Sequence, residues 1–264
     1  MKDQVIVITG ASSGIGAALT ELVGAKGARP VLLARREKEL RDVASRSGPE
    51  ALPLVADVTR REVVARAVQT VLSRFGRIDV WVNNAGQGIT RLVSELTDDD
   101  FDEMMLVNVK SALYGMQAVL PHFRERGRGH IINVSSLLGR VPFTPIRSAY
   151  SAAKHALNAL TANLRMELRT QHPGIIVSSV HPGVVATDFG RKARYGGPDS
   201  RQFPGAQTVE EVAKVIADLI ENPRADVYTR PGAQQLVVGY YAADDMGRRE
   251  QAPPFVPGSA PGRP

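Results

Sequence analysis

Tyr150 and Lys154 are the residues whose types and spacing most directly suggest chemistry. Four residues apart on a helix, their side chains share one face, one turn from each other. Free tyrosine has a pKa near about 10, so proton transfer at neutral pH requires a reduction of about three units, or roughly 4 kcal/mol. One unit charge at about 4 Å supplies about 4 kcal/mol at an effective dielectric constant of about 20. The pair therefore predicts a phenol that a neighbouring ammonium group turns into a usable acid or base.

A glycine-rich turn near the N-terminus predicts a phosphate site. The apolar run Val5–Ile8 leads into Thr9-Gly10-Ala11-Ser12-Ser13-Gly14-Ile15-Gly16, whose last two glycines open a predicted helix. Glycine permits a tight turn and a close approach of the backbone to a ligand. The free N–H groups and the dipole of a helix start then favour a pyrophosphate. The spacing Gly-x-x-x-Gly-x-Gly differs from the commoner dinucleotide fingerprint, but its place between a strand and a helix favours a dinucleotide.

Two arginines after the second predicted strand indicate which dinucleotide is bound. An NAD site usually has a carboxylate here, which bonds the ribose 2′-hydroxyl. This chain has Arg35 and Arg36 instead. A guanidinium can hold a 2′-phosphate with paired hydrogen bonds, whereas a carboxylate would repel it. We therefore expect NADP(H) to be preferred over NAD(H), with Arg35 as the main contact; the alternative is that both arginines are a solvated helix entry.

Apolar, β-branched runs alternate with longer amphipathic stretches along most of the chain. Such strands, separated by helices, are typical of a parallel sheet covered on both faces. The sequence therefore predicts an α/β fold, a Rossmann-type doubly wound parallel sheet of about seven strands with helices on both faces. The predicted strands are Val5–Ile8, Val31–Ala34, Leu52–Ala56, Ile78–Val82, His130–Val134, Ile175–Val180 and Ala225–Thr229. The predicted helices are Gly14–Lys26, Glu37–Ser45, Arg60–Phe75, Asp98–Arg126, Ser148–Thr170 and Val209–Glu221.

Local signals mark helix starts and the limits of the domain. Two segments have the residue order of a capping box, Thr59-Arg60-Arg61-Glu62 and Thr208-Val209-Glu210-Glu211. Thr97 is followed by three aspartates, whose charge the dipole of a helix start favours. We expect a single dinucleotide-binding catalytic domain over residues 1–249, in which segment 188–206 is a mobile substrate lid. The Pro/Gly-rich residues 250–264 are expected to form a disordered tail.

Composition excludes several kinds of site. The 264 residues include no cysteine, which excludes disulfides, thiolate metal sites and a cysteine nucleophile. The five histidines have no metal-ligand spacing, so no metal is expected. The net charge of +6 is spread along the chain and is interpreted as a basic surface, with no nucleic-acid partner. No apolar run approaches the roughly 20 residues of a membrane span, and nothing reads as a signal peptide, so we expect a cytoplasmic protein.

Several further motifs occur in a fixed order with the two already described. They are Asp57-Val58, Asn83-Asn84-Ala85-Gly86, Asn108, Ser136 and Pro182-Gly183-x-x-x-Thr187. Together with the glycine turn and Tyr150-x-x-x-Lys154, they cover residues 5 to about 190. On these motifs the chain resembles the short-chain dehydrogenase/reductase family, whose members transfer a hydride between a nicotinamide and a substrate.

The resemblance implies a role for each catalytic residue. Tyr150 would donate a proton to a carbonyl oxygen or take it from an alcohol, and Ser136 would hydrogen-bond the same oxygen. Lys154 would also bond the nicotinamide ribose. Asn108 would help to hold a water chain leading to the lysine, or it is an interior polar residue bonded to the backbone. In most members the serine lies one residue closer to the tyrosine, so Ser135 stays an alternative to the preferred Ser136.

The resemblance also implies cofactor contacts and an assembly. The helices Asp98–Arg126 and Ser148–Thr170 would pair across a two-fold axis, which gives a homodimer or homotetramer. The residues expected at the cofactor are Gly10, Ser12, Ser13, Gly14, Ile15 and Gly16 in the turn, Arg35 and Arg36, Asp57 and Val58 at the adenine, Asn84, Ala85 and Gly86 on the adenosine side, Tyr150 and Lys154, and Pro182, Gly183, Val185 and Thr187 at the carboxamide.

The expected function is NADP(H)-dependent transfer of a hydride between nicotinamide and a carbonyl compound or secondary alcohol, with Tyr150 as acid or base. A 3-oxoacyl-[acyl-carrier-protein] reductase-like enzyme is one alternative, although the run Val227–Pro231 lacks the Gly-Gly pair usual in that group. A non-catalytic NADP(H) sensor or scaffold is another, but such proteins tend to lose the tyrosine or the lysine, and this chain keeps both. The small-molecule substrate stays open among apolar ketones, steroid-like compounds and anionic thioesters.

Overall fold

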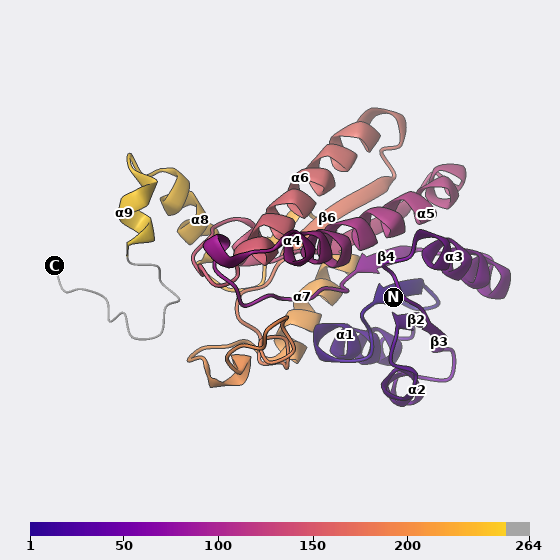
Figure 1. The fold of residues 1–264 in the computed structure, drawn as a ribbon. Coiled ribbons are helices and arrows are strands. Elements are labelled where there is room, and N and C mark those ends of the chain that lie inside the picture. The colour runs from indigo at the N-terminus through magenta and orange to yellow at the C-terminus, as the bar shows by residue number, and fades with distance from the viewer. Residues whose placement is uncertain (252–264) are drawn as a thin grey trace.

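Seven strands form one parallel sheet in the computed structural model, which describes residues 1–251 (Figure 1). The strands are β1 Val5–Thr9, β2 Arg29–Ala34, β3 Leu52–Val55, β4 Val80–Asn83, β5 Gly129–Val134, β6 Ile175–His181 and β7 Asp226–Tyr228. Their order across the sheet is β3-β2-β1-β4-β5-β6-β7, so the direction of winding reverses between β1 and β4. Every predicted strand is present, with ends that differ by at most two residues.

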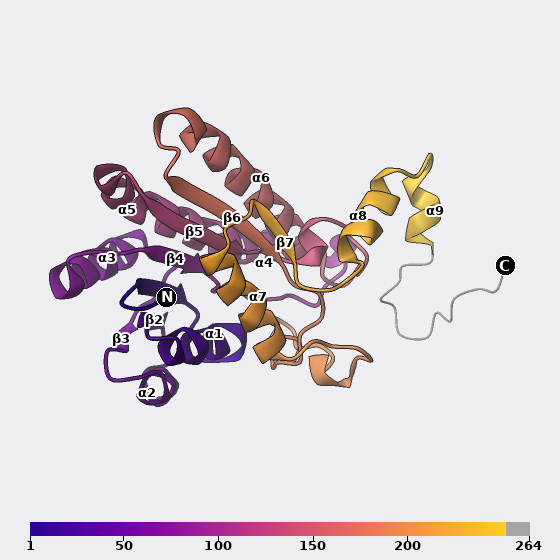
Figure 2. The ribbon, with the colours of Figure 1, turned by 180° about the vertical axis from the view of Figure 1, so that it is seen from behind.

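Helices cover both faces of the sheet (Figures 1 and 2). They are α1 Gly14–Ala25, α2 Glu37–Arg46, α3 Arg61–Phe75, α4 Asp98–Met105, α5 Ser111–Arg126, α6 Ser148–Gln171, α7 Val209–Glu221, α8 Ala233–Tyr241 and α9 Met246–Glu250. One face packs against α1, α2 and α7, and the other against α3, α5 and α6. Strand residues alternate between these layers: Ile6 and Ile8 belong to one core, and Val5 and Val7 to the other. The predicted doubly wound fold is confirmed.

The single long helix expected over Asp98–Arg126 is wrong, because a π-helical turn at Leu106–Lys110 separates α4 from α5. The buried side chain of Asn108 lies in this turn and donates to the Met104 carbonyl at 3.1 Å. That carbonyl is the acceptor that an α-helix would give to the backbone N–H of residue 108. The side chain therefore competes with the helical ladder. Such bulges inside helices are frequent at functional sites.

The helix caps correct one prediction and confirm another. Thr208 and Glu211 form the expected capping box at the start of α7, and Thr97 and Asp100 form one at the start of α4. The capping box expected at Thr59 is wrong. Its hydroxyl and N–H both bind Asp57 instead, so α3 begins at Arg61 without a side-chain cap.

Sequence analysis missed α8 and α9, which lie beyond β7 and away from the sheet (Figures 1 and 2). Val237 and Tyr240 of α8 pack with Val141 and Phe143, which precede α6. The predicted tail begins with Glu250, but this residue ends α9 and accepts a hydrogen bond from the Tyr240 hydroxyl at 2.6 Å. The rest of that prediction, for residues 252–264, lies outside the described residues.

The expected lid, residues 188–206, is irregular as predicted, with a short 3₁₀ turn at Ser200–Gln202. An ion pair ties it to α4, because Arg194 contacts the buried Asp100 at 2.6 Å, and a second pair lies within the segment, where Asp188 contacts Arg201 at 2.8 Å. Its mobility stays a prediction. Among the helices of residues 1–251, none has the length and apolar character that a bilayer crossing needs.

Candidate active site

The residues expected in the site converge at the carboxyl-terminal edge of the sheet. The glycine turn follows β1, Asn84 to Gly86 follow β4, the serine pair follows β5, and Pro182 to Thr187 follow β6. β1 and β4 are neighbours, and the winding reverses between them. In open parallel sheets, ligands bind in the crevice outside the strand ends at such a point.

The glycine turn packs tightly against the loop after β4. Gly10 and Gly14 have φ angles of +67° and +58°, a backbone region that favours glycine. A Cβ on Gly16 would stand 2.5 Å from the Gly10 carbonyl oxygen, and a Cβ on Gly10 would stand 2.9 Å from Ala85 Cα. The backbone conformation and the close contacts both require glycine here, so the turn holds a defined shape.

The start of α1 has free donors. Ser13 is the N-cap, its side chain accepts no hydrogen bond from the helix backbone, and the first turn has no acidic residue. The first N–H groups of a helix have no partner within it, and the dipole favours an anion there. Ile15, the second residue of α1, is half-buried against the core. This helix start fits the pyrophosphate of a dinucleotide.

The structure gives Arg36 a better position than Arg35 beside this turn. Arg36 Nη2 donates to Ser12 Oγ at 2.9 Å and to Ser13 Oγ at 2.7 Å. Arg35 is exposed at the end of β2, and its positive charge helps to lower the pKa of Asp57. A guanidinium beside two hydroxyls is a donor set suited to a phosphate. Which of the two arginines is the main contact stays a prediction.

Asp57 and Val58 lie where the chain leaves β3. The Asp57 carboxylate accepts from the Thr59 N–H at 3.0 Å and from its hydroxyl at 2.7 Å. Burial raises the pKa of Asp57, but these hydrogen bonds and the charges of Arg35 and Arg60 outweigh burial and hold the pKa below its usual value. Val58 packs against the core on the α3 side. The carboxylate is thus ionised and held in one orientation.

The loop after β4 is tied to β1 on one side. Thr9 Oγ1 accepts from the N–H groups of Asn84 and Ala85 at 2.9 and 3.0 Å. Asn84 Nδ2 donates to the Thr9 carbonyl at 2.9 Å. A Cβ on Gly86, the residue after Ala85, would stand 3.0 Å from Asn108 Oδ1 and 3.6 Å from Lys154 Nζ. The backbone of this loop therefore lies beside two residues expected to be catalytic.

Asn108 fixes the same loop from the other side. Its Nδ2 donates to the Gln87 carbonyl at 2.9 Å, and its Oδ1 accepts from the Gln87 N–H at 3.2 Å. The side chain is 1% exposed. These bonds match one of the two alternatives, an interior polar residue bonded to backbone. The water chain stays a prediction.

Tyr150 and Lys154 share one face of α6, as their spacing predicted. The Lys154 Nζ lies 5.7 Å from the centre of the Tyr150 ring. It donates to the Val134 carbonyl, at the end of β5, at 2.9 Å. Both side chains are buried, and burial raises the pKa of Tyr150 to about 12 and lowers the pKa of Lys154 to about 8.

Two groups oppose the effect of burial on the pKa of Tyr150, and Lys154 is not one of them. They are the Ser136 hydroxyl and the charge of Arg147. Arg147 is the N-cap of α6, three residues before the tyrosine. The Lys154 ammonium group donates to the Val134 carbonyl, and the lowering of the Tyr150 pKa by the lysine stays a prediction.

The two serines after β5 make different contacts. Ser135 Oγ donates to the Lys154 carbonyl at 3.4 Å, against the α6 backbone. Ser136 Oγ accepts from the Leu138 N–H at 3.1 Å. A hydrogen bond between its hydroxyl and Tyr150 lowers the pKa of the phenol, against the effect of burial. Of the two hydroxyls, that of Ser136 interacts with Tyr150, and its catalytic role stays a prediction.

The segment from Pro182 to Thr187 leads from β6 to the irregular region. The Pro182 carbonyl accepts from the Leu137 N–H at 2.8 Å, and a Cβ on Gly183 would stand 2.9 Å from an Arg230 side-chain carbon. Val185 is buried. Thr187 Cγ2 lies 3.5 Å from where a Cβ on the first residue of α1 would stand. Thr187 therefore borders the expected pyrophosphate position.

Arg147 and the placement of Phe189 were missed by sequence analysis. The Phe189 ring lies edge-on to that of Tyr150, with 5.3 Å between centroids and 62° between planes. Arg147 is buried, and its Nη1 donates to the Ile89 carbonyl and the Thr90 hydroxyl, both at 3.1 Å. The i, i+3 spacing of Arg147 and the tyrosine was a usable signal. No local pattern places Phe189, which comes from the distant lid.

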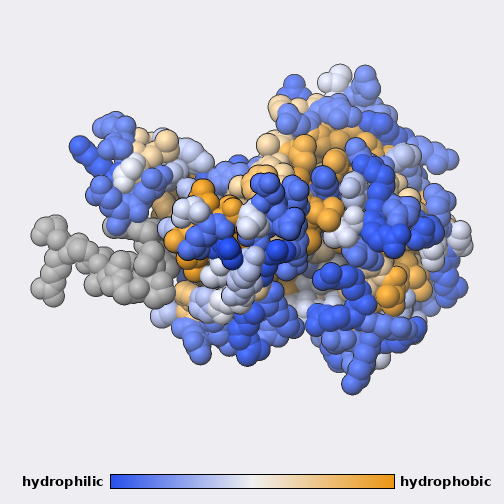
Figure 3. All heavy atoms as spheres, viewed as in Figure 1, coloured by the Kyte–Doolittle hydropathy of each residue, from blue (hydrophilic) through white to orange (hydrophobic). Residues whose placement is uncertain are grey.

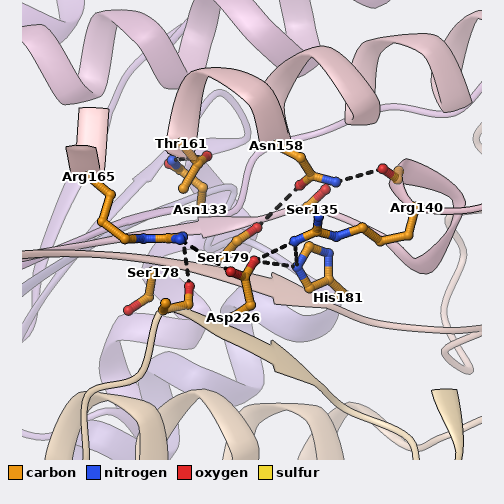
Figure 4. Close-up of polar contacts among 12 residues, drawn as sticks. Asn133, Ser135, Arg140, Asn158, Thr161, Arg165, Ser178, Ser179, His181 and Asp226 are labelled. Carbon is orange, nitrogen blue, oxygen red and sulfur yellow. Dashed lines mark hydrogen bonds and ion pairs between the residues drawn. The ribbon is translucent and has the colours of Figure 1, made fainter. Parts of the chain in front are cut away.

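A second polar cluster lies behind the site, between α6, β6 and β7 (Figure 4). His181 Nε2, at the end of β6, lies 3.0 Å from Asp226 Oδ1, and Arg140 and Arg165 contact the same carboxylate at 2.5 and 3.2 Å. Burial lowers the pKa of His181, although the hydrogen bond of its ring to the Asp226 carboxylate opposes this effect. The cluster holds the strand end that continues into Pro182.

Comparison with known proteins identifies the family. The family model described as short chain dehydrogenase matches residues 4–196. The uncharacterized oxidoreductase YxnA of Bacillus subtilis is 37% identical over 244 residues, which are 90% of this chain and 68% of the relative. The chain therefore belongs to the short-chain dehydrogenase/reductase family and is an oxidoreductase of that family.

Two similar solved structures hold a dinucleotide. A short-chain dehydrogenase/reductase from Burkholderia phymatum, in complex with NAD, has a TM-score of 0.82 and 26% identity, covering 90% of this chain and 92% of that one. A short-chain dehydrogenase from Burkholderia cenocepacia, in complex with NADP, has a TM-score of 0.79 and 30% identity, covering 95% and 97%. Similar proteins thus bind either dinucleotide, so the choice between them rests on this chain's own residues.

Proposed function

We propose that this protein is an NADP(H)-dependent reductase of carbonyl compounds, with residues 1–249 as one catalytic domain. One observation carries the proposal. The buried face of α6 presents Tyr150 and Lys154 together, beside Gly86 and the Ser136 hydroxyl, at the carboxyl edge of the sheet. This is the arrangement that a proton relay beside a bound dinucleotide requires.

Each residue around the reacting oxygen would have its own role. Bound nicotinamide would supply the hydride for reduction, or accept it in the reverse direction. With a pKa of about 12, the Tyr150 hydroxyl is protonated at neutral pH, which is the form that donates a proton to a carbonyl oxygen. Ser136 would hydrogen-bond the same oxygen as negative charge develops. Lys154 would hold the nicotinamide ribose.

The preference for NADP(H) would come chiefly from Arg36, with Ser12 and Ser13 beside it. Arg36→Asp places a carboxylate where the 2′-phosphate is expected, so it should weaken NADPH binding by roughly 10- to 100-fold and favour NADH. Arg35→Asp should have a smaller effect, because its side chain is exposed and bonds neither serine of the glycine turn. Dissociation constants from nicotinamide fluorescence test this. An unchanged preference in Arg36→Asp would remove the assignment.

Two further parts of the proposal concern surfaces. The segment 188–206 would act as a lid, because Phe189 covers the Tyr150 ring. The outer face of α5 and α6 would pair with a second copy of the chain, since apolar atoms gather over these helices (Figure 3). Leu113 and Leu164 are half-buried there, and Met166 is 64% exposed.

The test of the proposed function is isotope transfer from cofactor to product. The protein would be incubated with a ketone panel and NADPH carrying deuterium at the transferable position of nicotinamide. Deuterium on the new alcohol carbon of a product is the expected result. NADPH binding with no transfer to any ketone or aldehyde would contradict the proposal and favour the sensor or scaffold alternative.

A further inference from the structure

We propose that the carbonyl substrate of this site carries a carboxylate, and that Arg147 binds it. The inference rests on the proposed function, because it names the substrate class of the site around Tyr150. It starts from an arginine that is buried beside the reactive phenol and has no acidic partner among residues 1–251.

Arg147 is 9% exposed, at the start of α6. Within the described chain, its side chain bonds the Ile89 carbonyl and the Thr90 hydroxyl, both through Nη1. Burial lowers its pKa, and no carboxylate of residues 1–251 offsets this. Removing a cation from water without a counter-charge is unfavourable. Two hydrogen bonds to a loop, which a neutral glutamine could also make, do not explain a buried guanidinium.

Three acidic residues of α4 and the lid are paired with other arginines. Asp100 of α4 contacts Arg194 at 2.6 Å, and Asp188 of the lid contacts Arg201 at 2.8 Å. Glu103 of α4 also contacts Arg194. These two lid arginines are thus neutralised by acidic residues of the protein itself. Arg147 is left with its charge unbalanced in the described part of the chain.

Three of the five N–H donors of Arg147 are unused by the described residues, namely Nε–H and the two on Nη2. These nitrogens are not sealed from solvent, unlike the buried unpaired nitrogens of His130 and His181. Nε and Nη2 form the edge of a guanidinium that binds both oxygens of a carboxylate through parallel hydrogen bonds. The free edge of the side chain is therefore the edge that fits a carboxylate.

The guanidinium and the phenol border the same aromatic ring. A Cβ on Gly88 would stand 2.9 Å from Phe189 Cε1 and 3.1 Å from Arg147 Nη1, so these two side chains are adjacent. The Phe189 ring centre lies 5.3 Å from that of Tyr150. A substrate that displaces this ring would reach Tyr150 with its carbonyl and Arg147 with an acidic group. Gly197 of the lid borders the free edge of the guanidinium, because a Cβ on Gly197 would stand 3.1 Å from Nη2.

The first test is binding of an unreactive probe pair, benzoate and benzamide, to the full protein with NADP⁺ bound. Titration calorimetry should give a dissociation constant for benzoate that is roughly 10- to 100-fold lower than for benzamide, because one is charged and the other neutral. In Arg147→Gln this ratio should fall towards one, and Arg147→Lys should retain part of it. Equal affinities in the unmodified protein overturn the inference.

The second test is kinetic and uses pyruvate, acetoacetate and levulinate, each beside its methyl ester, with NADPH. At least one acid should exceed its ester in kcat/KM by roughly 10- to 100-fold. Arg147→Gln should lose this ratio. Arg169→Gln, which removes an exposed arginine in the last turn of α6, should keep it.

The outcomes separate the two proposals. If the esters are reduced as well as or better than the acids, the inference is overturned and the proposed function stands. If no ketone is reduced but benzoate still binds through Arg147, the proposed function is overturned and the carboxylate site stands. Should Arg147→Gln fail to fold, the charge-retaining Arg147→Lys and the probe pair on the unmodified protein decide the question.

Discussion

At the scale of single residues, the proposed chemistry of this protein depends on cations placed around one buried phenol. Lys154 follows Tyr150 by one helical turn and Arg147 precedes it by nearly one, so three functional groups share the start of α6. The spacing of Tyr150 and Lys154 was visible in the sequence because it is local. The direction of the ammonium group was not, because the Val134 carbonyl that attracts it comes from β5.

The lysine sets an expected pH limit for ketone reduction. Burial lowers the pKa of Lys154 to about 8, so the ammonium group loses its charge as the pH rises through this value. Tyr150, with a pKa of about 12, stays protonated over the same range. We expect kcat/KM for reduction to fall by about tenfold per pH unit above about 8.

The variant Lys154→Arg tests the cause of this limit. A guanidinium keeps its charge far above pH 8, so the fall in rate should vanish from the pH profile or move to higher pH. The measurement is the pH dependence of kcat/KM for both proteins. Identical profiles would show that another group sets the limit.

At the scale of elements, the π-helical turn between α4 and α5 links the fold to the site. It brings Asn108 to the backbone of Gln87, next to the loop that borders Lys154. Sequence analysis predicted one continuous helix here because the helical period runs through the segment unbroken. A side chain that replaces a helical hydrogen bond depends on a distant loop, which no local pattern encodes.

Asn108→Ala should destabilise the protein by about 1–3 kcal/mol, because the Gln87 N–H and carbonyl lose their partner in a partly buried loop. Asn163→Ala, at an exposed position of α6, is the matched control and should change stability by less than about 0.5 kcal/mol. Urea unfolding of both variants measures the difference. Equal stability of the two variants would contradict the role given to this side chain.

At the scale of the whole molecule, seven strands and most helices were predictable from apolar period and turn residues. The alternation of Ile6 and Ile8 with Val5 and Val7 fixes the two layers, because strand side chains alternate between faces. The C-terminal helices were not predictable, because α8 is short and contains Gly239 near its end. The packing of α8 on Phe143 is a tertiary contact that stabilises a helix whose own sequence has little helix propensity.

A buried histidine makes the whole fold sensitive to acid. His130 lies on β5, its Nε2 is 2.8 Å from Ser178 Oγ, and its Nδ1 has no partner among the described residues. Burial lowers the pKa of His130 to about 4. On acidification, His130 is therefore protonated at a higher pH in the unfolded chain than in the folded protein. Its contribution to the free energy of unfolding should be fully present above about pH 6.5 and be lost as the pH falls towards 4.

This group alone should remove about 3 kcal/mol of unfolding free energy between those two pH values. His130→Gln can still donate to Ser178 and does not titrate, so it should show a shallower decline in stability over the same range. Guanidinium unfolding at several pH values compares the two proteins. Parallel declines would exclude His130 as the cause.

The central claim is that Tyr150 is the proton donor at a dinucleotide site, and Tyr150→Phe tests it most directly. One hydroxyl is removed, so turnover of a ketone at saturating NADPH should fall by roughly a hundred- to ten-thousandfold while the NADPH dissociation constant stays within about twofold. Tyr114→Phe on α5 serves as the control and should keep its turnover. Near-normal turnover in Tyr150→Phe would contradict the account.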